Sequence, residues 1–352
     1  MAARLAQVTG AEHTAMLGLG VYRPARVVTN DEVAGPINSS DEWIRTRSGI
    51  RTRRFASDSE TIIAMSAAAA RDALDSAGVT PDQIGCVIVA TSTWLLLTPA
   101  AAPQIATELG MKSPAAFDIS AGCAGFCHAV GLASDLVKGG TASHVLVIGV
   151  ERLTDTFNPE DRSTAFLFAD GAGAVVIGPS DEPGIGPTVW GSEGDQHHAI
   201  RQNKDWMQFF VEIEEKGLDA VRPYLAMEGT AVFRWAAHSL KKVCLDAIDR
   251  AGLTPAEIDA FVPHQANGRI IDIMARELKL AEDCALATDI EEAGNTSAAS
   301  IPLAMEALLR KGDTKPGAAA LLVAFGAGLS YAAQVVTLPN WAPNPGSRSP
   351  SR

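Results

Sequence analysis

Short, continuous apolar runs alternate along this chain with longer segments in which apolar residues recur at helical spacing. Four runs that read as buried strands, rich in β-branched and other apolar residues, are 86–93, 144–151, 260–267 and 320–327. The helical segments that end near 77 and 251 are each followed by a glycine stop and a Thr-Pro restart. This alternation predicts an α/β fold in which helices cover largely parallel strands.

One long uncharged stretch needs separate interpretation. No charged residue occurs from Ile84 to Thr107, but the stretch contains Pro99, Pro103 and several hydroxyl residues. A membrane span should be predominantly apolar. We therefore expect a buried strand, a loop and the start of a helix, and no association with a membrane.

The chain contains an internal repeat. Residues 72–84 and 246–258 are identical at eight of thirteen positions, and 120–140 resembles 292–312. The second match aligns Cys123 with Asn295. A weaker third match pairs 144–151 with 320–327 in the same order. A two-fold arrangement of the halves could therefore bring Cys123 and Asn295 together near the pseudo-axis.

The repeat sets the expected domain organisation. We expect two duplicated α/β halves, which span 15–182 and 183–338. Residues 1–14 are expected to be flexible. The segment 339–352 is rich in proline and serine and is expected to be disordered.

The overall charge narrows the class of partner. The formal net charge is −12, whereas nucleic-acid binding requires a basic surface, so no nucleic-acid partner is expected. The five cysteines have no framework spacing, and the first residues contain no apolar stretch of signal-peptide length. These features favour free thiols in a reducing, cytoplasmic setting.

Cys123 lies between a strand pattern and a helix pattern, in the segment AGCAG. Unpaired N–H groups at a helix start would lower its pKa and favour the thiolate. The alternative is a buried structural thiol, which is also our interpretation of Cys127. The two cysteines lack a second cluster at zinc-site spacing, so no metal site is expected.

Two further residues could take part in chemistry. His264 ends an apolar run in VPHQAN, and α/β folds present functional groups at strand ends; it could equally be a hydrogen-bonded core histidine. Asn295 in GNTSAAS could be a helix N-cap or an amide donor to a carbonyl oxygen. The glycine-rich turn 325–328 lets backbone N–H groups approach a ligand, or is simply a tight turn.

Taken together, these motifs resemble the thiolase-fold condensing enzymes, specifically β-ketoacyl-acyl carrier protein synthase III. The resemblance covers about residues 16–338 and includes, in order, SSDEWIRTRSGIRTRR, AGCAG, FADGAGA, VPHQAN, GNTSAAS and FGAG. It implies a duplicated, layered αβαβα fold and a homodimer. It also implies that Cys123 is the nucleophile and that His264 and Asn295 complete a triad. The N–H groups of Cys123 and Ala327 would form the oxyanion hole, with alanine at a position where the family has glycine.

The resemblance also implies a binding channel for coenzyme A and its pantetheine arm. The residues at the matching positions are Trp43, Arg47, Arg162, Gly229, Phe233, Ala236 and Asn267. Arg234 and Arg269 match basic positions that meet the acyl carrier protein. No cofactor or metal is implied, because coenzyme A is part of the thioester substrate.

The acyl pocket departs from the acetyl-selective pattern of the family. Phe325 matches a residue of this pocket, and Thr98 stands where phenylalanine is frequent and where the side chain enters from the partner subunit. A smaller side chain leaves volume, so we expect an acyl primer larger than acetyl. The segment 191–211 departs most from the common pattern and could also shape specificity.

The resemblance implies a two-step reaction. An acyl-coenzyme A primer is transferred to Cys123, and malonyl-acyl carrier protein then condenses with it by decarboxylation, which initiates fatty acid or polyketide synthesis. An alternative is a related acyltransferase that passes the acyl group to an alcohol or amine; retention of both His264 and Asn295 favours condensation. A papain-like hydrolase has the same Cys, His, Asn order, but its local cysteine signature is absent and the repeat is unexplained. A catalytically idle scaffold is the remaining alternative, which thiol reactivity would test.

Overall fold

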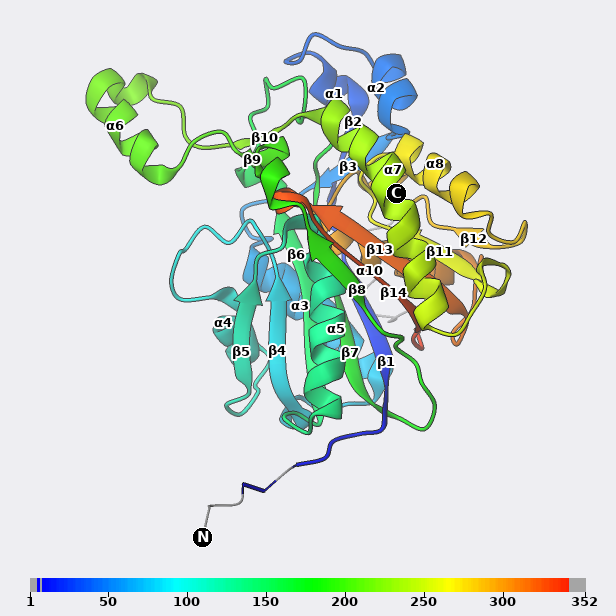
Figure 1. Ribbon diagram of the computed structural model, residues 1–352. Helices are drawn as coiled ribbons and strands as arrows, with labels where there is room; N and C mark the ends of the chain where they lie inside the picture. The colour runs from blue at the N-terminus through cyan, green and yellow to red at the C-terminus, as the bar shows by residue number, and fades with distance from the viewer. Residues whose placement is uncertain (1–4, 7, 342–352) are drawn as a thin grey trace.

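Two five-stranded sheets with the same strand order form the framework of the protein (Figure 1). The structure is a computed structural model that describes residues 5–6 and 8–341. The first sheet has the order β1-β7-β6-β4-β5 and the second the order β8-β14-β13-β11-β12. The strands of the first sheet are β1 (His13–Tyr22), β4 (Ile84–Ala90), β5 (Ala115–Ile119), β6 (His144–Arg152) and β7 (Asp170–Ser180). Those of the second are β8 (Val189–Ser192), β11 (Ala260–Pro263), β12 (Ala285–Leu286), β13 (Ala319–Gly326) and β14 (Ser330–Thr337).

In each sheet four strands run in one direction, and one strand, next to an edge strand, runs in the other. In the first sheet β4 pairs in parallel with β5 and β6, and β7 runs antiparallel to β6 and β1. In the second sheet β11 pairs in parallel with β12 and β13, and β14 runs antiparallel to β13 and β8. The matching topology confirms the duplication predicted from the sequence, and it adds the antiparallel strands that the sequence pattern did not predict.

The helices form three layers around the two sheets. Helices α5 (Gly125–Lys138) and α10 (Ser300–Lys311) pack between the sheets, where they contribute to one apolar core that contacts both. Helices α3 (Ile62–Ala77) and α4 (Ala101–Glu108) cover the first sheet. Helices α7 (Gly229–Arg250) and α8 (Gly268–Leu278) cover the second. The result is the predicted αβαβα arrangement.

Local sequence signals place the ends of the repeated helices where expected. Helix α3 ends at Ala77, and Gly78 follows with a left-handed φ of 65°. At the corresponding place after α7, Gly252 has a φ of 73°. Thr80 and Thr254 each begin a short 3₁₀ turn through a capping box. The uncharged stretch from residue 84 forms β4, a loop and α4, and no helix in the described part of the chain is long and apolar enough to cross a membrane.

Smaller elements surround the upper end of the two sheets in Figure 1. The ribbon of β2 (Arg26–Thr29) and β3 (Thr52–Phe55) carries α1 (Asn30–Ala34) and α2 (Asp41–Ser48) between its strands. A second ribbon, β9 (Ile200–Gln202) with β10 (Leu225–Met227), carries α6 (Trp206–Lys216), which projects from the body of the molecule (Figure 1). Helix α9 (Ile290–Ala293) precedes the Asn295 segment.

The expected flexible segment at the amino terminus is too long in our prediction. Strand β1 already begins at His13, and the N–H of Gly10 donates to the Lys138 carbonyl at 3.1 Å. Pairing with β7 orders the last of these residues, because each extended residue gains ladder hydrogen bonds there. At the other end Asn340 forms a bridge with Gly18, and Trp341 packs against the apolar core between the sheets. Residues 342–352 of the predicted disordered tail lie outside the described residues.

Candidate functional site

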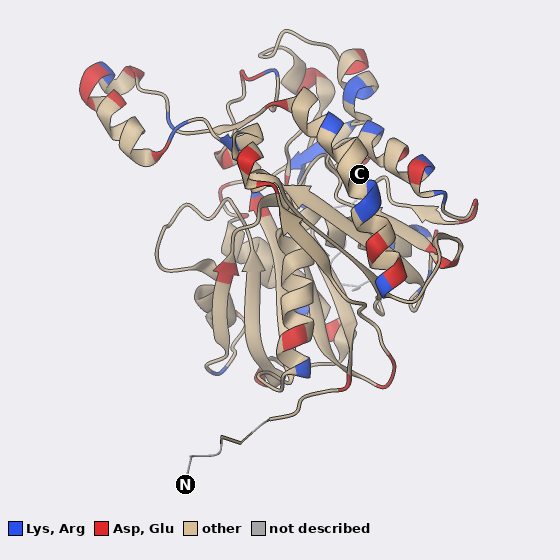
Figure 2. Ribbon diagram, in the orientation of Figure 1, with Lys and Arg blue, Asp and Glu red and all other residues tan. Residues whose placement is uncertain are grey.

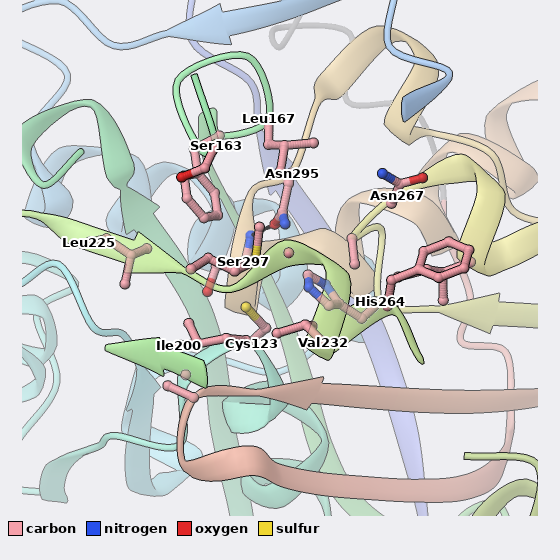
Figure 3. Close-up of a pocket in the computed structure, with 18 of the residues that line it drawn as sticks. Cys123, Ser163, Leu167, Ile200, Leu225, Val232, His264, Asn267, Asn295 and Ser297 are labelled. Carbon is pink, nitrogen blue, oxygen red and sulfur yellow. Dashed lines mark hydrogen bonds between the residues drawn. The ribbon is translucent and has the colours of Figure 1, made fainter. Parts of the chain in front are cut away.

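The pseudo-symmetry brings the two aligned residues to one cavity. Cys123 lies in a 3₁₀ turn, η2 (Gly122–Ala124), directly before α5, and Asn295 directly precedes the equivalent region before α10. Both residues, with His264, line a cavity of about 590 Å³. Figure 3 shows their side chains turned toward a common space. The geometric expectation from the repeat is therefore met: Cys123 and Asn295, 172 positions apart in sequence, converge because each half places the same strand-to-helix junction at this cavity.

Burial acts on the Cys123 thiol against the expected lowering of its pKa. Although part of the residue is exposed to the cavity, burial raises the pKa of the Cys123 thiol to about 12, and the nearby Glu151 charge acts in the same direction. Hydrogen bonds from Ser297 and from its own backbone N–H oppose this but do not outweigh it. Desolvation thus opposes the lowering of the thiol pKa that the helix start was expected to give, and the thiolate stays a prediction.

His264 is held as a neutral imidazole. Burial lowers the pKa of His264 to about 3, because the imidazolium cation would lose its hydration in this interior. Nδ1 lies 2.7 Å from the Ser300 hydroxyl, which also accepts a bond from the Gln265 N–H. We assign the hydroxyl proton to Nδ1, so that Nε2 carries the N–H. The Phe325 ring packs edge-on at 5.5 Å and fixes the imidazole plane.

The amide of Asn295 is oriented by its own turn. Its Oδ1 accepts a hydrogen bond from the Ser297 N–H at 2.9 Å. Since the oxygen is engaged there, the Nδ2 donors are left for the cavity. The alternative that Asn295 is an ordinary helix N-cap is partly correct, because this Asx turn leads into the 3₁₀ turn η7 (Ser297–Ala299) and α10.

Two backbone segments pack closely beside the thiol. A Cβ on Gly326 would lie 2.5 Å from the Cys123 nitrogen, and a Cβ on Gly122 would lie 2.9 Å from the Ala327 nitrogen. Gly122 also has a left-handed φ of 52°. These glycines allow the turn after β13 to bring the Ala327 and Cys123 backbones together at the cavity wall. The Ala327 side chain packs against the apolar cluster of the second half, so its Cβ is accommodated.

The mouth of the cavity is cationic and aromatic. Trp43, on α2, has the Arg162 guanidinium over its ring at 4.7 Å and that of Arg47 at 5.5 Å. Phe166 packs against the same ring edge-on at 5.1 Å. A flat ring with two guanidinium groups beside it is suited to bind an aromatic base and phosphate groups.

Most of the remaining predicted residues also line the cavity, but some do not. The further lining residues that were predicted are Gly229, Phe233, Asn267, Arg269 and Phe325. Asn267 caps α8 and donates to the Arg47 carbonyl at 3.0 Å, which ties α8 to α2. Arg269 lies 5.2 Å from the Phe233 ring.

Three predicted residues are absent from the cavity wall. Ala236 is fully buried in the core under α7, and Val232, one helical turn earlier, faces the cavity instead. Arg234 is exposed outside it. Thr98 lies in the loop after β4, away from the cavity of the single chain. Its assignment to the acyl pocket required a partner subunit and stays a prediction.

The sequence did not reveal several residues that shape the site. One is Ser297, which lies beside Cys123. Another is Glu151, a buried residue that accepts a hydrogen bond from Ser297 and ends an otherwise apolar run. That isolated acid in HVLVIGVE was the available signal. Ile200, Leu225 and Met227 line the cavity from the β9–β10 ribbon; Ile200 lies in the segment singled out for its departure from the family pattern. Within the described residues, no three His, Cys, Asp or Glu side chains form a group that could hold a metal ion.

Comparison with known proteins gives a consistent result. The C-terminal model of 3-oxoacyl-[acyl-carrier-protein (ACP)] synthase III matches residues 248–338, and the other model of that family matches 117–194. The chain is 56% identical over 335 residues to a β-ketoacyl-[acyl-carrier-protein] synthase III of Mycobacteroides abscessus, covering 95% of this chain and 98% of that protein. It is 55% identical to the enzyme of the same name from Streptomyces glaucescens, covering 94% and 98%.

A solved structure is similarly close. The priming β-ketosynthase from the R1128 polyketide biosynthetic pathway has a TM-score of 0.91 and 46% identity, covering 96% of this chain and 99% of that one. Its similarity extends over both halves and therefore includes the junctions that carry Cys123, His264 and Asn295. The chain belongs to the β-ketoacyl-[acyl-carrier-protein] synthase III family of thiolase-fold condensing enzymes.

Proposed function

We propose that the enzyme transfers an acyl group from coenzyme A to Cys123 and then condenses it with malonyl-acyl carrier protein to give a β-ketoacyl thioester. The observation that carries this proposal is the pair of fixed neutral donors beside the thiol. Ser300 orients His264, and the Ser297 N–H orients the Asn295 amide. Acyl transfer to an alcohol or amine would require a base rather than two donors.

In the first step the Cys123 sulfur attacks the thioester carbonyl carbon, and coenzyme A leaves. Negative charge develops on the carbonyl oxygen, which the N–H groups of Cys123 and Ala327 would stabilise. Loss of one such donor costs roughly 3–4 kcal/mol of activation free energy. Trp43, Arg47 and Arg162 would hold the nucleotide end of the primer at the mouth of the cavity.

In the second step the malonyl thioester loses CO₂, and charge moves to its thioester oxygen. His264 Nε2 and Asn295 Nδ2 would donate to that oxygen. No proton is removed from carbon, so a histidine that stays neutral is suited to this role. The resulting carbanion attacks the acyl carbon on Cys123, forming the carbon–carbon bond and releasing the sulfur.

The loop that ends at Thr98 and the edge strand β5 support a homodimer, and the small size of Thr98 supports a primer larger than acetyl. Leu95, Leu96 and Leu97 are 53%, 56% and 90% exposed in the loop that ends at Thr98, and such apolar side chains favour burial against a partner. Strand β5 is an edge of the first sheet. In a dimer, Thr98 would enter the partner's acyl pocket, opposite Phe325, and its small size would leave room for a longer chain.

The basic residues near the mouth support binding of an acidic carrier protein. Figure 2 shows Lys and Arg on α2, α7 and α8 at the same end of the molecule. Arg269 lines the cavity and Arg234 is exposed on α7. This chemistry requires no cofactor. We propose that the enzyme acts in the cytoplasm.

The proposal is tested by a condensation assay with malonyl-acyl carrier protein and a panel of acyl-coenzyme A primers. We expect β-ketoacyl product, with branched or longer primers preferred over acetyl. His264→Ala and Asn295→Ala should block malonyl decarboxylation while Cys123 is still acylated. Normal condensation by both variants would show that these roles are wrong.

A further inference from the structure

A positive charge is fully buried behind the residues at the mouth of the cavity. Arg53, on β3, has no exposed surface and is among the largest fully buried side chains. Its guanidinium is charged at neutral pH, and its hydrogen bonds run to three neutral oxygens. An apolar side chain of similar size would fill this place without the cost of desolvating a cation. The guanidinium therefore calls for an explanation beyond packing.

The guanidinium connects two segments that are distant in sequence. Nη1 donates to the Thr29 carbonyl at 3.2 Å, and Nη2 donates to Asn30 Oδ1 at 2.6 Å. Nη2 also donates to the carbonyl of Phe166, 113 positions away, at 3.1 Å. The planar fork holds these donors in fixed directions. Arg53 therefore sets the position of the Phe166 backbone relative to the end of β2.

One of these bonds leads to the aromatic ring at the mouth. Phe166, whose carbonyl Arg53 holds, packs edge-on against Trp43 with the ring centroids 5.1 Å apart. Both rings line the cavity, and the Arg162 guanidinium lies over the Trp43 ring at 4.7 Å. Because Phe166 supports the Trp43 ring, a shift of its backbone would also shift the ring against which Arg162 packs.

Another of these bonds leads to the helix that carries Trp43. The Asn30 side chain accepts from Arg53 through Oδ1, and its Nδ2 donates to Asp41 Oδ1 at 2.7 Å and to the Ile50 carbonyl at 2.8 Å. Asp41 is the first residue of α2, and Ile50 lies just beyond its end. Since Arg53 occupies the amide oxygen, both Nδ2 protons are directed toward the two ends of α2. Arg53 thus acts on the position of Trp43 from two directions.

We propose that Arg53 is a positioning residue for the nucleotide end of coenzyme A. It holds the Phe166 backbone directly and α2 through Asn30, so that the Trp43 ring is in place before the substrate arrives. A binding site that is ordered in advance loses less free energy to ordering when the ligand binds. Arg53 itself lies outside the cavity wall, so its effect is on binding and not on the reacting atoms. This inference rests on the proposed function, in which Trp43 binds that end of the primer.

The proposal is tested by steady-state kinetics with acyl-coenzyme A and with the matching acyl-pantetheine, which lacks the nucleotide. Arg53→Met fills much of the same volume but has no donors. We expect KM for acyl-coenzyme A to rise by about 2- to 30-fold, no more than in Trp43→Ala. The maximal rate and the KM for acyl-pantetheine should stay unchanged. The double variant should have the same KM as Trp43→Ala alone, because Arg53 acts through that ring.

Two further variants separate positioning from a general loss of structure. Arg54→Met removes the next guanidinium on β3, which bonds the Pro24 and Ala25 carbonyls instead, and should leave both KM values unchanged. Asn30→Ala removes only the connection to α2 and leaves Arg53 bonded to the backbone. It should also raise KM for acyl-coenzyme A alone, and it provides the test if Arg53→Met does not fold.

The outcomes distinguish this inference from the function on which it rests. A normal KM for acyl-coenzyme A in folded Arg53→Met or in Asn30→Ala would overturn the role of Arg53. An equal rise in KM for both substrates would do the same, because the effect would then not concern the nucleotide. If Trp43→Ala itself leaves the KM for acyl-coenzyme A unchanged, the proposed nucleotide site is wrong, and the role of Arg53 is overturned with it.

Discussion

The Ser300 hydroxyl and His264 Nδ1 lie 2.7 Å apart within the protein interior. Ser300 is the first residue of α10, the helix that directly follows the Asn295 turn. One short segment therefore positions both donors of the site: Asn295 through its own turn, and His264 through Ser300. This relationship gives the first prediction.

Ser300→Ala should slow malonyl decarboxylation by roughly fivefold to tenfold, the value of about one hydrogen bond. Without the hydroxyl, the neutral ring is free to place its proton on Nδ1 and lose the donor at Nε2. Acylation of Cys123 should change little. Ser66→Ala provides a matched control, since this buried hydroxyl in α3 has no hydrogen-bond partner among the described residues. Equal effects of the two substitutions would contradict the assigned tautomer.

The lowered pKa of His264 predicts an unusual pH dependence. Its ordinary value of 6.5 falls to about 3 on burial, so the ring stays neutral as the pH falls through 6.5 and protonates only near pH 3. Decarboxylation by a Cys123→Ala variant should therefore be nearly flat from about pH 8 to 5. A decline with a midpoint near 6.5 would show that the ring titrates normally in the site.

The guanidinium groups over the Trp43 ring at the mouth of the cavity should affect substrate binding but not the chemical step. Trp43→Ala or Arg162→Ala should raise KM for acyl-coenzyme A by about 2- to 30-fold, corresponding to a cation–π contact of 0.5–2 kcal/mol. The maximal rate should be preserved, because neither residue contacts the reacting atoms. A truncated acyl-pantetheine substrate should respond to neither substitution, and steady-state kinetics on both substrates provides the measurement.

The contact between the turn after β13 and Cys123 predicts a steric effect. In Gly326→Ala the new Cβ would meet the Cys123 nitrogen at 2.5 Å, which should cost about 1–3 kcal/mol of unfolding free energy and slow acylation. Gly194→Ala is the control, because nothing lies within 4 Å of its added Cβ. Thermal unfolding of both variants checks this, and equal stability would contradict the close approach.

The repeat made much of the site predictable from sequence. Aligning Cys123 with Asn295 located both junctions, because each half folds the same way. The burial that raises the pKa of Cys123 was not predictable, since it comes from groups distant in sequence. The contact between Glu151 and Ser297 was not predictable for a related reason: 146 positions separate them, and only the fold makes them neighbours.

Other parts of the prediction failed for local reasons. Ala236 was placed in the channel by analogy, but its helical position turns it into the core, whereas Val232 reaches the wall. Strand β1 begins inside the segment expected to be flexible, because pairing with β7 starts at His13. The assignment of Thr98 to the acyl pocket is not one of these failures: it depends on a second subunit and stays a prediction.

The central claim is that Cys123 carries the acyl group. The most direct measurement is intact-protein mass spectrometry after mixing the enzyme with acyl-coenzyme A thioesters, from acetyl to branched and medium chains. We predict a gain of one acyl mass that maps to Cys123, is absent in Cys123→Ala, and is largest for a primer longer than acetyl. No gain with any thioester, or a gain at another residue, would contradict the account.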